Sequence, residues 1–233
     1  MDAIILAGGK GTRMRPLTDH TPKPLLTVRG KPILEWSLRS LRPVADHVLV
    51  VAKYLKPQIE AYMAAQTIFE HYTIVEQTPQ PLGTGHAVQC CQPHLKSASF
   101  LVVNGDDIYD NESLRQLADT EAGLLAAHKG DQSRWGVLVT GDDGRLLHID
   151  EKPAEGTYPT PVQINIGAYK LTDAVFDHDL PKSERGEYEI TGYVSYLADR
   201  TPMQVIPAAF WLPIGTVDDY EQAQSKPLER WMP

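Results

Sequence analysis

The residues best suited to chemistry form a glycine-rich loop near the start of the chain, LAGGKGTRMRPLTDHTPKP. Gly8, Gly9 and Gly11 follow a short apolar run, so the backbone there can turn sharply and bring its N–H groups against an anion. Arg13 and Lys23 come shortly afterwards and can neutralise the charge of that anion. The loop is therefore predicted to bind phosphate.

Two common phosphate-binding motifs do not fit this loop. A Walker loop requires Ser or Thr directly after its lysine, whereas Lys10 is followed by glycine. A dinucleotide-binding fingerprint that starts at Gly9 requires glycine where the chain has Met14. The whole chain has a formal net charge of −8, although its first 31 residues hold six Lys or Arg against two acids. A cationic pocket in an acidic protein favours a small phosphorylated ligand over nucleic acid, with an exposed basic loop as the alternative.

Other candidate groups follow strand-like runs. Asp106 and Asp107 lie in an acidic turn directly after an apolar run, where open α/β sheets present ligand-binding groups. Gln77 ends another such run, and small residues in LGTGHAV beyond it let backbone amides approach a flat base. The structural alternatives are that the two acids cap a turn and that Gln77 faces the core or the solvent.

The spacing of apolar residues predicts the elements that hold these groups. Buried strands are indicated by four apolar runs, at residues 3–7, 47–52, 72–77 and 99–106. Helix-like segments alternate with them, at residues 32–41, 56–65 and 84–91. Strands that alternate with helices predict right-handed βαβ units, a parallel sheet and the α/β fold class.

The pattern changes after about residue 120. Strand-like segments then follow one another with turns between them, in GLLAAHK, RWGVLVT, RLLHIDEKP and VQINIGAYKL. We expect this half to extend the sheet and to add an antiparallel layer. Apolar residues at helical spacing predict a helix within residues 186–200. Since no linker separates the halves, we expect one domain, residues 1–233, with two lobes at about 1–120 and 121–233.

Composition predicts a soluble, cytoplasmic protein. The two cysteines, Cys90 and Cys91, are adjacent and therefore poorly placed for a disulfide. The start of the chain lacks the pattern of a signal peptide, and no apolar run approaches the roughly 20 residues that span a bilayer. We expect no membrane partner.

Taken in order, the motifs resemble those of the sugar-1-phosphate nucleotidyltransferases, also called nucleoside-diphosphate-sugar pyrophosphorylases. Residues 6–14 and 22–24 match the opening motif L-A-G-G-x-G-T-R-[LM] and the following P-K-P. The likeness continues through VEQTPQPLGTGHAV, VVNGDDIY, IDEKP, INIGAY and FWLPIGTVDDY. The resemblance implies a Rossmann-like mixed, mainly parallel sheet flanked by helices, with nucleotide bound by the first half and sugar by an antiparallel part in the second.

The resemblance also implies a reaction and its residues. A sugar 1-phosphate attacks the α-phosphorus of a nucleoside triphosphate, with Mg²⁺ as cofactor, and pyrophosphate leaves. Arg13 neutralises the triphosphate, Lys23 reaches the α-phosphate and Asp106 holds Mg²⁺. The residues implied to bind the nucleotide are Leu6, Ala7, Gly8, Gly9, Gly11, Thr12, Gln77, Gly83 and Thr84. Those implied to bind the sugar and its phosphate are Gly136, Glu151, Lys152 and Asn165.

One late position departs from the family pattern. Many members carry a second metal carboxylate in W-x-D-x-G-T, but this chain has Pro213 there, and proline cannot ligate a metal. Either Asp106 suffices with phosphates and water, or Asp218 or Asp219 substitutes, although Thr216 and Asp219 also fit a helix capping box. A third possibility is an inactive, nucleotide-sugar-binding regulatory subunit.

The nucleotide and the acceptor follow less directly from the motifs. UTP is favoured because LGTGHAV looks most like the uridylyltransferases for N-acetylglucosamine 1-phosphate. The nucleotides dTTP and CTP stay open, as does glucose 1-phosphate. A cytidylyltransferase for phosphocholine shares the opening loop, but EKP and INIG favour a sugar acceptor. The sequence leaves the oligomeric state open, and a homo-oligomer is compatible with it.

Overall fold

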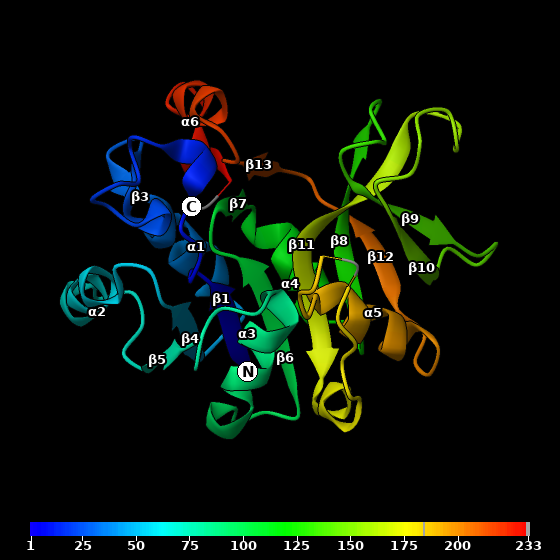
Figure 1. Cartoon of the computed structure of the whole chain (residues 1–233), viewed down its shortest axis with the longest axis horizontal. Coiled ribbons are helices and arrows are strands. Elements are labelled where there is room, and N and C mark those ends of the chain that lie inside the picture. Colours follow the sequence, from blue (N-terminus) through cyan, green and yellow to red (C-terminus); the bar gives the residue numbers. More distant parts are fainter. Residues whose placement is uncertain (184, 232–233) are drawn as a thin grey trace.

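The computed structural model describes residues 1–183 and 185–231, and its framework is a nine-stranded sheet (Figure 1). At its centre β1 (Asp2–Leu6) runs parallel to β4 (His47–Ala52) on one side and to β6 (Ser99–Asn104) on the other. The parallel group is completed by β5 (Tyr72–Glu76), which pairs with β4. The four predicted strands are therefore confirmed, except that β6 ends two residues earlier than expected.

Antiparallel strands continue the same sheet in the second half of the chain. The long strand β11 (Val162–Thr172) runs antiparallel to β6 and also pairs with β8 (Gly123–Lys129) and β9 (Gly136–Thr140). Beyond β9 lies β10 (Leu146–Glu151), at the opposite end of the molecule from β5 (Figure 1). The α/β class is confirmed, and these antiparallel strands extend the sheet itself.

Helices cover both faces of the sheet, as βαβ connections require. One face carries α1 (Ile33–Leu41), α2 (Lys56–Ala65) and α4 (Asn111–Ala118). The other face carries α3 (Thr84–Cys91) and α5 (Ile190–Ala198), the second of which is shorter than the predicted range 186–200.

Successive residues of β1 point to opposite faces of the sheet, as the strand period of two requires. Ala3 and Ile5 are buried with α1, α2 and α4, whereas Ile4 is buried with α3 and α5. This strand therefore lies between two hydrophobic cores, and both cores combine residues from the two halves of the chain.

Several short elements were not predicted from the sequence. One strand, β12 (Gln204–Pro207), runs parallel to β8. Two small antiparallel ladders lie outside the main sheet: β2 (Thr27–Val28) with β3 (Lys31–Pro32), and β7 (Asp107–Tyr109) with β13 (Trp211–Pro213). The last α-helix in the described chain is α6 (Val217–Ala223), whose start the capping box of Thr216 and Asp219 indicated in the sequence. A third hydrophobic cluster packs β2, β7, α1 and α6 around the buried Met14, which anchors the end of the glycine-rich loop.

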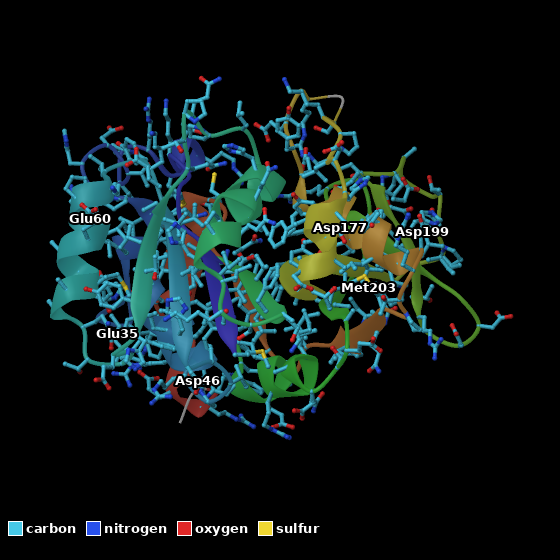
Figure 2. The ribbon with its side chains drawn as sticks, turned by 90° about the horizontal axis from the view of Figure 1, so that it is seen from below. Glu35, Asp46, Glu60, Asp177, Asp199 and Met203 are labelled. Carbon is cyan, nitrogen blue, oxygen red and sulfur yellow. The ribbon has the colours of Figure 1, made fainter. Side chains whose placement is uncertain are left out.

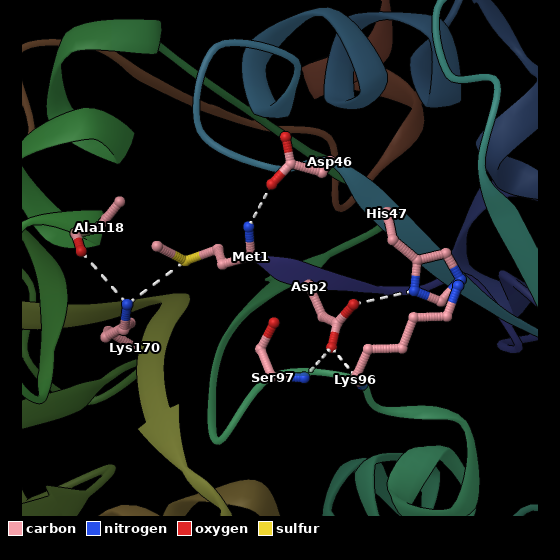
Figure 3. Close-up of polar contacts among 8 residues, drawn as sticks. All are labelled: Met1, Asp2, Asp46, His47, Lys96, Ser97, Ala118 and Lys170. Carbon is pink, nitrogen blue, oxygen red and sulfur yellow. Dashed lines mark hydrogen bonds and ion pairs between the residues drawn. The ribbon is translucent and has the colours of Figure 1, made fainter.

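Asp2, the first residue of β1, connects the central strands at one end of the sheet (Figure 3). Its Oδ1 lies 2.9 Å from Nδ1 of His47, whose Nε2 lies 2.9 Å from Oγ1 of Thr73. Its Oδ2 accepts hydrogen bonds from the backbone N–H groups of Lys96, at 2.6 Å, and Ser97, at 2.7 Å. These bonds join β1 to β4, to β5 and to the segment that leads into β6.

Acidic side chains lie around the periphery of the molecule. Asp46, Glu60, Asp177 and Asp199 are all exposed (Figure 2).

Within residues 1–183 and 185–231, no helix is long and apolar enough to span a bilayer. The cytoplasmic location stays a prediction.

Candidate functional site

A cavity of about 470 Å³ opens where the parallel strands β1 and β6 end. This is the edge at which open α/β sheets bind ligands. Its lining includes each residue that the resemblance assigned to the nucleotide, the metal or catalysis, namely Leu6, Ala7, Gly8, Gly9, Gly11, Thr12, Arg13, Lys23, Gln77, Gly83, Thr84 and Asp106. We call it the loop cavity. The structure thus brings together residues that lie up to 100 positions apart in the sequence.

The glycine-rich loop is shaped by contacts behind it. Gly11 has a φ of 61°, and a Cβ at this position would lie 3.0 Å from the Thr18 side chain. Thr18 also donates a hydrogen bond of 2.8 Å from its Oγ1 to the Gly11 carbonyl. A short 3-10 helix, Thr12–Met14, follows and leaves Arg13 exposed beside the cavity. Within the described residues, Arg13 forms no ion pair with an acidic group, so its guanidinium can bind an external anion.

Lys23 and Asp106 form an ion pair in the loop cavity, with 2.6 Å between Nζ and Oδ2. The lysine begins a 3-10 helix, Lys23–Leu25, and only 6 % of it is exposed. Asp106 lies in the turn between β6 and β7, and 39 % of its side chain is exposed. Gly105 brings that turn close to β1, because a Cβ on Gly105 would lie 2.7 Å from the Leu6 carbonyl oxygen.

Asp107, the next residue, belongs to a different cavity. Its side chain is buried, and its Oδ2 accepts hydrogen bonds of 3.2 Å from Nδ2 of Asn104 and from the hydroxyl of Tyr109. Burial and the neighbouring Asp106 carboxylate raise the pKa of Asp107 to about 7. Asp106, and not Asp107, therefore faces the phosphate loop.

The second cavity, of about 210 Å³, lies beside the first. Asn104 lines both cavities, and Asp107 lines the second with three of the residues predicted to bind sugar, Gly136, Glu151 and Asn165. We call it the side cavity. Lys152, the fourth predicted residue, lines neither cavity. It is exposed, has a φ of 52°, and donates its backbone N–H to the Trp135 carbonyl at 2.9 Å.

A bulge in β11 positions Asn165. The pairing of β11 with β8 shifts between Asn165 and Tyr169, around Gly167 with its φ of 77°. A side chain at Gly167 would collide with the Asn104 amide, so glycine is required there. Asn165 donates from Nδ2 to the Tyr169 hydroxyl at 2.8 Å and accepts from the Gly167 N–H at 3.1 Å, which fixes its amide at the cavity wall.

Charged groups from the segment before α5 approach the side cavity. The surrounding protein and the Glu189 carboxylate raise the pKa of Glu151, at the end of β10. Glu189 is itself paired with Arg185, at 2.6 Å between Oε1 and Nη2. Arg185 and the cavity residues Trp135 and Trp211 were not predicted from the sequence, although Trp135 adjoins Gly136 and Trp211 lies two residues before Pro213.

Asp219 is engaged at the start of a helix and does not line the loop cavity. Its Oδ2 accepts hydrogen bonds from the backbone N–H groups of Gly215, at 3.1 Å, and Thr216, at 2.8 Å, and from the Thr216 hydroxyl, at 2.8 Å. The capping box at the start of α6 is confirmed, and it disfavours Asp219 as the substitute metal ligand. Pro213 pairs with Asp107 in the ladder of β13 and β7. No cluster of three or more His, Cys, Asp or Glu suited to a metal occurs in residues 1–183 and 185–231.

A carboxylate beside a phosphate loop nevertheless suits Mg²⁺. This ion commonly takes one or two carboxylates and completes its octahedron with substrate phosphates and water. Two carboxylates of the described residues line the loop cavity, Asp106 and Glu187, and Asp106 is the one in contact with Lys23 of the phosphate loop. It is therefore the residue that fits a magnesium ion here.

Comparison with known proteins agrees with this geometry. The family described as Nucleotidyl transferase matches residues 2–230. The chain is 34 % identical over 233 residues to the Bifunctional protein GlmU of Methanococcus maripaludis, covering 99 % of this chain and 55 % of that relative. It thus spans about half the length of these GlmU relatives. It is 33 % identical over 247 residues to the UTP--glucose-1-phosphate uridylyltransferase AglF of Haloferax volcanii, covering 97 % of this chain and 96 % of the relative.

Solved structures show the same fold. A UDP-glucose pyrophosphorylase complexed with UDP-glucose superposes with a TM-score of 0.85 at 20 % identity, covering 98 % of each chain. The UDP-glucose pyrophosphorylase from Acinetobacter baumanii gives a TM-score of 0.82 at 21 % identity, covering 96 % of this chain and 91 % of that one. Identity at this level supports the fold alone. The resemblance seen in the sequence motifs is confirmed by the family match and the curated relatives: the chain belongs to the nucleotidyl transferase family.

Proposed function

We propose that this chain is a Mg²⁺-dependent sugar-1-phosphate nucleotidyltransferase, with UTP as the favoured nucleotide. The observation that carries the proposal is the adjacency of two cavities that share Asn104. One contains the residues assigned to the nucleotide, and the other contains Gly136, Glu151 and Asn165, assigned to the sugar. The name of the Haloferax volcanii relative points to uridylyl transfer, which supports this class of reaction.

The reaction asks the protein to bring two polyanions together. An oxygen of the sugar 1-phosphate attacks the α-phosphorus, the bond from that phosphorus to the bridging oxygen breaks, and pyrophosphate leaves with the bonding electrons. Such a transfer is promoted by positioning and charge neutralisation, without a covalent enzyme intermediate. Arg13 binds the triphosphate and then the pyrophosphate. Lys23 binds the α-phosphate after it exchanges its partner Asp106 for the substrate.

Asp106 would hold Mg²⁺ in the loop cavity. The ion, when bound, neutralises charge on the phosphates and orients them. Since Pro213 offers no carboxylate and Asp219 is engaged at a helix cap, the proposal relies on one protein ligand with phosphates and water.

The side cavity would receive the sugar. Glu151 accepts hydrogen bonds from sugar hydroxyls, and Gly136 and Asn165 form the wall. Lys152 is left out of the proposal because its exposed side chain lines neither cavity. We also propose that the first half of the chain, about residues 1–120, binds the nucleotide. The second half, about residues 121–233, binds the sugar. Glu187 and Gly215 reach the loop cavity from the second half.

One observation disfavours phosphocholine as the acceptor. A quaternary ammonium is usually bound by open aromatic faces. Trp135 and Trp211 are in edge contact, with ring centroids 5.5 Å apart, and the Nζ of Lys129 already lies 5.9 Å and 5.4 Å from their centroids. A resident cation at these rings would repel a second one.

Pyrophosphate release tests the proposal. Purified protein with Mg²⁺ is assayed with UTP, dTTP, CTP, ATP and GTP against a panel of sugar 1-phosphates and phosphocholine, with a chelator control. Release with UTP and one sugar 1-phosphate, abolished by the chelator, is expected. If no pair releases pyrophosphate while nucleotide-sugars still raise the unfolding temperature, the enzymatic proposal is contradicted and a regulatory binding subunit is favoured.

A further inference from the structure

The side-chain amide of Gln77 has a fixed direction in the loop cavity. Gln77 follows β5, and only 4 % of it is exposed. Its Nε2 donates to the Gly83 carbonyl at 2.8 Å and lies 3.1 Å from Nδ1 of His86. A carbonyl oxygen only accepts hydrogen bonds, so the Gln77 atom beside Gly83 must be the amide nitrogen. The orientation of the amide therefore follows from chemistry.

The other end of that amide is an acceptor open to the cavity. Oε1 of Gln77 accepts no hydrogen bond from any residue in the described ranges. This oxygen is also not completely buried, so a ligand can reach it. It lies beside Gly8, where an added Cβ would be 3.5 Å away, and both residues line the loop cavity. A ligand at this wall therefore meets a hydrogen-bond acceptor.

His86 supplies the second contact that holds this orientation. It lies in the first turn of α3, and its Nδ1 must accept the Gln77 N–H, which leaves the ring proton on Nε2. That nitrogen lies 3.8 Å from Sγ of Cys90. Partial burial lowers the pKa of His86, and the Thr78 carbonyl partly offsets this effect. The Tyr188 ring also packs near the imidazole, with centroids 6.4 Å apart.

We propose that His86 is a positioning residue for base selection: it holds the Gln77 amide with its carbonyl toward the nucleotide. A base that presents an N–H there, as N3–H of uracil or thymine does, gains a hydrogen bond. Cytosine presents an acceptor at N3 in the same pose and meets Oε1 without a proton between them. A binding site discriminates strongly against a ligand that leaves one of the site's buried polar groups without a hydrogen-bond partner. The inference rests on the proposed function and extends it to the residue that sets nucleotide choice.

The test compares UTP with CTP in wild type and variants. His86→Ala removes the acceptor, whereas His86→Asn keeps one, because its Oδ1 takes the place of Nδ1. The UTP/CTP ratio of kcat/KM should fall about tenfold or more in His86→Ala and recover in His86→Asn. The change should appear in KM for UTP, with KM for the sugar phosphate unaltered. Equal loss with both nucleotides would overturn the proposal, because it would mark a structural role.

Two further measurements separate positioning from general damage. If His86 acts through Gln77, His86→Ala should not change the ratio further in a Gln77→Ala background, whereas additive effects would contradict the coupling. The wild-type ratio should be constant above about pH 6.5, the ordinary pKa of histidine, and fall only at lower pH, because burial lowers the pKa of His86 and a protonated Nδ1 no longer accepts the amide. His86→Asn should show no such fall, and a fall in both proteins would also contradict the assignment.

Failure of the proposed function is distinguishable from failure of this inference. If no nucleotide turns over, titration calorimetry with UTP and CTP still measures the preference in binding. Tighter UTP binding that is lost in His86→Ala would support the inference without any activity. A wild type that binds both equally, or prefers CTP, would overturn it.

Discussion

Nζ of Lys23 lies 2.6 Å from Oδ2 of Asp106, so residues 83 positions apart form one ion pair in the lining of the loop cavity. The pair joins the phosphate loop after β1 to the turn after β6. In the free protein each charge neutralises the other. Binding of a metal–triphosphate complex gives both groups new partners, the carboxylate a cation and the ammonium a phosphate.

Lys23→Ala should lower kcat/KM about tenfold or more, which corresponds to about 1.4 kcal/mol of transition-state stabilisation or more. The reason is that the variant removes the ammonium that meets the α-phosphate. Lys10→Ala is the matched control, because Lys10 belongs to the same loop, is exposed and does not line the cavity. Steady-state kinetics measure both variants. Equal rates for Lys23→Ala and wild type would remove this lysine from the mechanism.

Asp106→Asn should raise the Mg²⁺ concentration needed for half-maximal activity, by about tenfold, since a neutral amide binds a hard cation less well. Asp107→Asn should leave that concentration unchanged, because the Asp107 side chain is buried beside the other cavity. Metal titrations of the two variants under identical conditions decide between them. The opposite pattern would move the metal ligand by one position.

The framework of the site followed from local sequence, because the central strands are short, continuous apolar runs rich in β-branched residues, which favour buried parallel strands. The short strands β12 and β13 did not follow from it. They have four and three residues, and each ends in a proline. Their strand character comes from pairing with β8 and β7, which local propensity does not encode.

The candidate site shows the same limit at single residues. Asp106 and Asp107 are chemically identical, and which of them faces the phosphate loop depends on how closely Gly105 meets Leu6 across the sheet. Lys152 was predicted beside Glu151, but its left-handed backbone leaves its side chain outside the lining of both cavities. The residues that would bind the phosphates were easier to predict because their glycines and cations are contiguous in the sequence.

Ionisation of Asp107 should cost folding stability. Its pKa in the folded protein is raised to about 7 by burial and by Asp106, above the value of 3.8 for an unperturbed aspartate. A raised carboxyl pKa means that the folded state binds the proton more tightly than the unfolded state. Stability therefore falls as pH rises from about 4 to about 7 and levels off above that range.

Asp107→Asn isolates this effect, because an amide of the same shape does not titrate. In metal-free buffer, the free energy of unfolding of Asp107→Asn relative to wild type should increase between pH 5 and pH 8. Urea denaturation at several pH values measures the difference. A difference that is independent of pH would show that Asp107 does not titrate in this range.

Asp2→Asn should destabilise the protein, and the pH dependence of this loss should be opposite in direction to that of Asp107. Burial tends to raise the pKa of Asp2, but the bonds from His47, Lys96 and Ser97 outweigh it and lower the pKa below 3.8. The stability that these bonds supply is present above the unfolded pKa and is lost as pH falls through the lower, folded value. At pH 7 the variant should lose about 1–3 kcal/mol of unfolding free energy, the usual cost of weakening hydrogen bonds to a buried charged group.

The size of that loss should shrink as the pH is lowered below about 4, where Asp2 of the unfolded wild type takes up a proton, and should continue to shrink until the folded carboxyl is protonated at its lower pKa. Asp46→Asn is the matched control, because Asp46 is an exposed aspartate that pairs only with the Met1 ammonium within the described residues, and its replacement should change stability little. Denaturant unfolding at pH 7 and pH 3 compares the three proteins. If Asp2→Asn loses the same unfolding free energy at pH 7 and at pH 3, the lost bonds do not depend on the charge of Asp2. Ionisation of Asp2 would then contribute nothing to holding β1, β4 and the segment before β6 together.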